Sequence, residues 1–156
     1  MNCTLLFCLA ITDKKNDIMA KVQLLAVLSI DGCLTELQSR KRLFRRLEDY
    51  GMEEIRENAL YKLTPDYSVS ILQEWREKSG NTCYLLEATA KNTEYANGLL
   101  RMNVIDEIIL YIVPCIIGTG RHLFKSVLPE TEWRIAESRK YDDGVMRLTY
   151  QRKKRN

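Results

Sequence analysis

The residues best suited to chemistry stand at the ends of apolar runs. Gly118-Thr119-Gly120 ends the apolar stretch 108–117, and Ser29-Ile30-Asp31-Gly32 ends the nearly continuous apolar stretch 22–28. Runs of this length are too short to cross a membrane and are typical of strands buried on both faces of a sheet. Ligands bind beside the ends of such strands, and glycine there lets the backbone approach a ligand closely. The alternative is that these residues only turn the chain.

The sequence lacks the motifs of several other kinds of functional site. The five cysteines have no C-x-x-C spacing and mostly lie in apolar runs, which is typical of reduced thiols in a cytoplasmic protein. The single histidine, His122, is interpreted as a loop residue, and with so few ligands no metal site is expected. No hydrolase motif occurs, and the Gly118–Gly120 loop does not have the G-x-G-x-x-G spacing of a dinucleotide fingerprint.

The elements that must position these residues alternate between strands and helices. The patterns predict strands over 22–30, 59–63 and 82–86, a long strand after Asp106-Glu107, helices over 39–50, 52–58, 68–79 and 93–102, and a final hairpin over 133–151. Ile71 and Met102 are expected to point into the core, and Thr93 is expected to cap its helix. This order predicts a three-layer α/β/α fold with a mixed, mostly parallel sheet and a C-terminal antiparallel hairpin.

The chain has the length of one domain. Residues 19–156 are predicted to form it, because Met19 opens the first strand as a native start would. Residues 1–18 include a short apolar stretch without the basic residues of a secretory signal. They are predicted to be a disordered or wrongly assigned N-terminal extension.

The motifs together resemble those of the RibD C-terminal domain family, the riboflavin-biosynthesis reductases of the dihydrofolate-reductase-like superfamily. Members open with a strand running into Ser-x-Asp-Gly, which here is Ser29 to Gly32. They later have an Asp-Glu pair, a buried strand, Pro-x-x-x-Gly-x-Gly and Leu-Phe. The matching residues here, in order and spacing, are Asp106, Glu107, Pro114, Gly118, Gly120, Leu123 and Phe124.

The resemblance implies an NADPH-dependent reductase of a pteridine- or pyrimidine-type substrate. The nearest reaction is reduction of 5-amino-6-(5-phosphoribosylamino)uracil. It implies that Asp31 holds or protonates the substrate and that Glu87 lies near substrate or cofactor. It also implies a cofactor site and a homodimer in the cytoplasm, and the residues it assigns to that site are Ser29, Gly32, Ala88, Thr89, Gly118, Thr119 and Gly120.

Two departures from the family pattern lead to a second hypothesis. The family has Glu-Gly-Gly where this chain has Glu87-Ala88-Thr89, and the segment between Gly32 and Glu87 is short for the family. Glycines at that position let cofactor phosphates reach backbone N–H groups at a helix start. The alternative function is therefore a binding or assembly module without a cofactor.

A basic cluster allows further alternatives. Its residues could bind the extra phosphate of NADPH, a phosphoribosyl group or nucleic acid, or they could form a solvated helix face balanced by nearby acidic residues. The net charge of +3 does not by itself indicate a nucleic-acid partner. The cluster consists of Arg40, Lys41, Arg42, Arg45 and Arg46.

Overall fold

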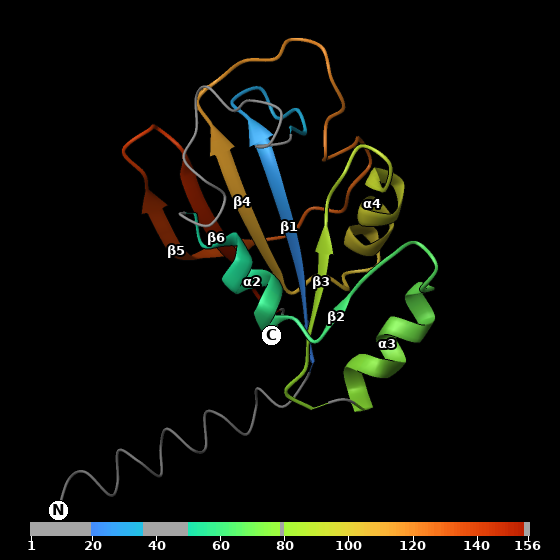
Figure 1. Cartoon of the computed structure of the whole chain (residues 1–156). Helices are drawn as coiled ribbons and strands as arrows, with labels where there is room; N and C mark the ends of the chain where they lie inside the picture. Colours follow the sequence, from blue (N-terminus) through green and yellow to red (C-terminus); the bar gives the residue numbers. More distant parts are fainter. Residues whose placement is uncertain (1–19, 36–49, 79, 155–156) are drawn as a thin grey trace, which may run out of the picture.

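The structure is a computed structural model that describes residues 20–35, 50–78 and 80–154. The extension 1–18, residues 39–49 of the predicted helix 39–50 and the basic cluster of Arg40 to Arg46 lie outside the described residues. Figure 1 shows the described elements. They are β1 (Lys21–Ser29), α2 (Met52–Asn58), β2 (Tyr61–Lys62), α3 (Val69–Lys78), β3 (Cys83–Glu87), α4 (Thr93–Arg101), β4 (Glu107–Val113), β5 (Trp133–Lys140) and β6 (Met146–Arg152).

The strands form one mixed six-stranded sheet in the order β2-β3-β1-β4-β6-β5. The first four strands are parallel, whereas β6 runs antiparallel to both β4 and β5. The predicted mostly parallel sheet with a C-terminal antiparallel hairpin is therefore confirmed. Because β1, β3 and β4 run in the same direction, the loops that leave them lie at one edge of the sheet (Figure 1).

Helices pack on both faces of the sheet and produce three layers. One core combines Leu24 of β1 with Leu72 of α3 and Leu99 of α4. The other combines Leu25, the next residue of β1, with Met52 at the start of α2. Successive side chains of a strand point to opposite faces, so a central strand covered by helices on both sides has a continuous apolar sequence.

Three details differ from the sequence-based prediction. The residue before α4 is Asn92, and Thr93 is instead buried within the first turn. The Ile71 side chain stays 39% exposed, because its neighbour Leu72 takes the position facing the sheet. Met102 is 53% exposed because α4 ends one residue earlier, at Arg101.

The C-terminal hairpin is much less covered than the rest of the sheet. Residues 134–140 of β5 are all exposed, and every residue of β6 is half-buried. Strand β5 is also an edge of the sheet. No helix in the described part of the chain is long and apolar enough to span a membrane.

Candidate functional site

The exit of β1 is a tight turn built around a buried serine. The Ser29 side chain is almost fully buried; its hydroxyl accepts a hydrogen bond from the Cys33 N–H at 3.0 Å and donates one to the Asp31 carboxylate at 2.5 Å. Gly32 has a φ of +81°, a backbone conformation that residues other than glycine rarely adopt. Ser29 and Gly32 therefore shape the turn that places the Asp31 carboxylate.

The Asp31 carboxylate joins this turn to the loop that follows β4. It accepts hydrogen bonds from the backbone N–H groups of Gly118, at 2.9 Å, and Ile117, at 3.2 Å. The bonds from Ser29, Gly118 and Ile117 hold the pKa of Asp31 far below its ordinary value. The geometry is that of an ionised carboxylate anchoring a loop, and a carboxylate with so low a pKa is a poor proton donor.

The two glycines of the loop after β4 have different surroundings. Gly118 has a φ of +77°, and no described atom lies within 4 Å of the position that a Cβ would take. A Cβ on Gly120 would lie 3.3 Å from the Cβ of Cys33, so this glycine permits close packing against the turn after β1. Within the described residues, the backbone N–H groups of Thr119 and Gly120 donate no hydrogen bond. Backbone donors without a partner among the described residues are suited to an anionic ligand.

The exit of β3 forms the third part of this edge. The Glu87 carboxylate accepts a hydrogen bond from Arg56 of α2 at 2.6 Å. Ala88 is half-buried, and the exposed Thr89 donates its N–H to the side chain of Asn92 at 2.8 Å. Thr89 thus lies just before the start of α4, where the first-turn N–H groups of a helix favour negative charge.

The loops after β3 and β4 are joined, but the two predicted catalytic carboxylates are not neighbours. Arg121 donates a hydrogen bond to the Ala90 carbonyl at 3.1 Å. Glu87 lies opposite Leu25, four positions before Ser29 on β1. At roughly 3.3 Å per residue this offset is about 13 Å along the strand. The structure therefore places Asp31 with the Gly118–Gly120 loop and places Glu87 with α2.

Sequence reasoning missed a buried asparagine that supports the site. Asn97 of α4 is fully buried and donates to the carbonyl groups of Thr93 and Leu123, each at 2.7 Å. Its side-chain oxygen accepts the Lys125 N–H at 3.1 Å. Asn97 thereby fastens the segment after the Gly118–Gly120 loop to α4. Its only signal in the sequence is an amide within a helix whose neighbouring residues are mostly apolar.

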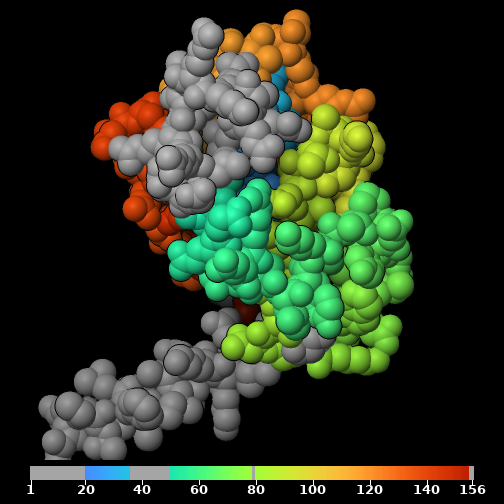
Figure 2. Space-filling model, viewed as in Figure 1, coloured from blue at the N-terminus to red at the C-terminus, as the bar shows by residue number. Residues whose placement is uncertain are grey.

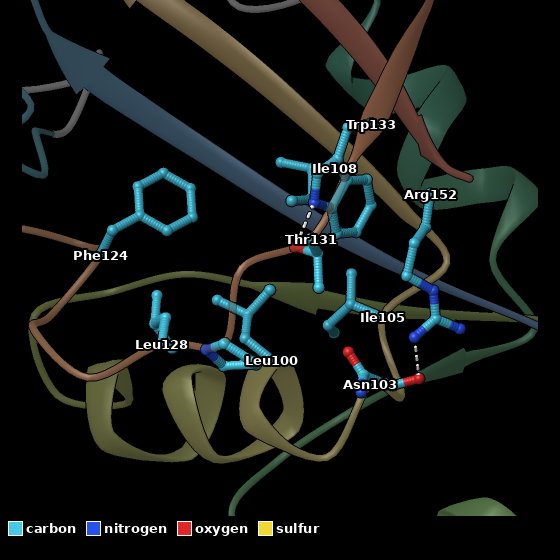
Figure 3. Close-up of a pocket in the computed structure, with 10 residues that line it drawn as sticks. Leu100, Asn103, Ile105, Ile108, Phe124, Leu128, Thr131, Trp133 and Arg152 are labelled. Carbon is cyan, nitrogen blue, oxygen red and sulfur yellow. Dashed lines mark hydrogen bonds between the residues drawn. The ribbon is translucent and has the colours of Figure 1, made fainter. Parts of the chain in front are cut away.

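A separate pocket lies toward the other end of β4, beside α4. It has a volume of about 130 Å³ and is lined mainly by apolar side chains, with Arg152 at one end and Phe124 at the other (Figure 3). The Arg152 guanidinium already donates to the Asn103 carbonyl and to Asp106. In the space-filling view the orange loop after β4 lies at the top of the molecule, beside α4 (Figure 2). The segment after β4 lines the pocket through Phe124, Leu128, Pro129 and Thr131, whereas the loops after β1 and β3 do not. The pocket contains no residue of the predicted site.

The comparisons with known proteins agree with this fold. The family model of the RibD C-terminal domain matches residues 92–147. A protein from Shewanella sp. PV-4 assigned to riboflavin biosynthesis has a TM-score of 0.68 at 15% identity, over 86% of this chain and 99% of its own. No curated protein matches the chain.

Two further solved structures are similar over 86% of this chain. The Thermotoga maritima deaminase and 5-amino-6-(5-phosphoribosylamino)uracil reductase has a TM-score of 0.57 at 13% identity, over 57% of its chain. The Enterococcus faecalis dihydrofolate reductase, solved with NADP(H), has a TM-score of 0.51 at 11% identity, over 97% of its chain. The resemblance stated from sequence is confirmed, and the fold is dihydrofolate-reductase-like.

Proposed function

We propose, from the premise that residues 92–147 belong to the RibD C-terminal domain family, that this chain is an NADPH-dependent reductase. Its proposed substrate is a pteridine- or pyrimidine-type compound, closest to 5-amino-6-(5-phosphoribosylamino)uracil. The Thermotoga maritima protein with the same fold is a reductase of that compound. The observation that most supports the proposal is the joining of the loops after β1 and β4 by Asp31.

The residues at this edge fit a phosphate-bearing nucleotide. The backbone N–H groups of Thr119 and Gly120, which have no acceptor among the described residues, and the first turn of α4 are suited to phosphate oxygens. The exposed Thr89 would supply a further polar contact through its hydroxyl. When bound, a nicotinamide cofactor supplies a hydride for reduction, and the protein's part is to position the two reactants and exclude water.

The remaining predicted residues have supporting roles in this proposal. Ser29 and Gly32 shape the turn that directs Asp31, and Ala88 packs against the apolar core. Asp31 orients the cofactor loop and offers its remaining lone pairs to a substrate N–H. Glu87 is fixed by Arg56 and would contact the ligand from the α2 face.

Ligand-dependent thermal unfolding tests the cofactor. A ligand at a hundredfold excess over its Kd stabilises the folded state by about 2.7 kcal/mol. For a chain of this size that corresponds to a rise in Tm of roughly 5–11 °C. NADPH is expected to produce this rise, and NADH and FAD, measured in parallel, are expected to produce less. An unchanged Tm with all three nucleotides would refute the reductase proposal.

The second candidate is a binding or assembly module without a cofactor. The methyl group of Ala88 and the larger side chain of Thr89 occupy the place where the family has two glycines. Thr89→Gly separates the two candidates. If the wild type binds no NADPH and this variant does, the natural side chain has closed the site.

We also propose that the protein forms a homodimer in the cytoplasm through the β5 edge. Strand β5 is open along its outer side, and Ile135 is 54% exposed on it. The cysteines within the described residues are free thiols, as expected in a reducing compartment. Light scattering should report a dimer for the wild type and a monomer for Ile135→Lys. Leu60→Lys, at the opposite edge of the sheet and 66% exposed, should remain dimeric.

A further inference from the structure

His122 stands directly against the turn that leaves β1. Its backbone pairs with Cys33 in an isolated antiparallel bridge. Its ring Nδ1 lies 3.5 Å from the place where a Cβ on Gly32 would be, and its Nε2 lies 4.0 Å from the Cys33 Sγ. His122 is also exposed. The imidazole therefore lies at the same sheet edge as the Asp31 carboxylate, with solvent-accessible surface available for a ligand.

The neighbouring groups are poorly suited to give up a proton at neutral pH. Asp31 is held as a carboxylate by its hydrogen bonds, and burial, with the nearby Asp31 charge, raises the pKa of the Cys33 thiol. Arg121 turns its guanidinium to the Ala90 carbonyl, and Glu87 is paired with Arg56. Imidazole is the side-chain group that ordinarily exchanges a proton between pH 5 and 8. Among the described residues at this edge, His122 alone carries an imidazole.

We infer that His122 is the proton donor of the reaction, an inference that rests on the proposed reductase function. Reduction of a C=N or C=O group needs a hydride at carbon and a proton at nitrogen or oxygen. As the hydride adds to the carbon, the π electrons move to the heteroatom. The proton of the imidazolium N–H then bonds to that heteroatom, and the neutral ring takes a new proton from water. Asp31 and His122 both approach Cys33, with the Asp31 Oδ2 at 3.7 Å and the His122 Nε2 at 4.0 Å from its Sγ.

Replacement of the imidazole tests this role. His122→Gln keeps a polar side chain of similar length but cannot donate a proton as an acid. General acid catalysis contributes roughly 10²- to 10⁴-fold, so kcat for NADPH oxidation with 5-amino-6-(5-phosphoribosylamino)uracil should fall by about that factor. The Kd of the variant for NADPH should stay within about threefold of the wild-type value. In the wild type kcat should fall with rising pH as the donor loses its proton, and this fall should be absent from the pH profile of the variant. Lys125→Gln, on the same segment, should retain wild-type kcat.

A second measurement does not require turnover. The chain has one histidine, so protein purified without a histidine tag gives unambiguous ring signals in an NMR spectrum. These signals should shift when NADP⁺ and the uracil compound are added together. Unmoved signals with both ligands bound, or a His122→Gln variant with wild-type kcat, would overturn the inference while leaving the reductase proposal intact. A wild type that binds no NADPH would remove both proposals.

Discussion

Replacing Asn97 with alanine should destabilise the protein while leaving its α4 helix intact. The change removes the partner of the buried Leu123 carbonyl and the partner of the Lys125 N–H. A buried polar group left without a hydrogen bond lowers the free energy of unfolding by about 1–3 kcal/mol. Because the Lys125 N–H is partly exposed, the loss of both partners should lower it by about 2–4 kcal/mol. The expected fall in Tm is roughly 4–16 °C.

The assay is thermal unfolding, with hydrogen exchange as a local readout. The Lys125 amide should exchange much faster in Asn97→Ala, because its acceptor is gone. Gly98→Ala is the matched control on the same helix, since no described atom lies within 4 Å of the added Cβ. It should gain about 0.5–1 kcal/mol from reduced backbone entropy in the unfolded chain. If Asn97→Ala melts within about 2 °C of the wild type, these hydrogen bonds do not contribute as the argument requires.

Three further predictions concern the loops of the site. Asp31→Asn places an N–H donor against the Gly118 N–H or the Ser29 hydroxyl. The affinity for NADPH, measured by calorimetry, should therefore fall at least tenfold. The control Asp66→Asn, on a distant turn, should not change this affinity. Because the pKa of Asp31 is lower in the folded state, its ionisation stabilises the protein above the ordinary carboxyl pKa, and this stabilisation is lost as the pH falls toward the folded value. The Tm advantage of wild type over Asp31→Asn should therefore shrink between pH 6 and pH 3, and a constant difference would contradict the assigned pKa direction. Gly120→Ala brings a Cβ within 3.3 Å of Cys33 and should cost about 1–3 kcal/mol in a denaturant titration; a midpoint equal to that of the wild type would mean that the loop moves away freely.

The strands and the general place of the site could be predicted because they depend on local patterns. After Glu107, strand β4 is apolar on both faces, and the loop that follows it contains Gly118 and Gly120. Residues 52–58 form a helix as expected. Parallel pairing then brings the exits of β1 and β4 to one edge without further information. These features follow from side-chain alternation and chain direction alone.

The partners within the site could not be predicted because they depend on strand register and loop conformation. Glu87 falls opposite Leu25 and not opposite Ser29, and no local pattern specifies that offset. The hydrogen bonds that the Asp31 carboxylate accepts from the loop after β4 join residues more than eighty positions apart. His122 appeared as an isolated loop residue, because its proximity to Cys33 results from the same long-range pairing.

The central position of β1 has a consequence for how the chain is synthesised. This strand is among the first described residues to leave the ribosome, yet its neighbours β3 and β4 come much later; Val22 bonds to Asp106, 84 positions away. Until β3 and β4 are synthesised, the apolar strand β1 has two unpaired edges. Such non-local strand pairing is slow, and an unpaired apolar strand is prone to aggregate. Release of soluble protein during translation should therefore depend on chaperone capacity and on the rate of elongation through residues 30–106.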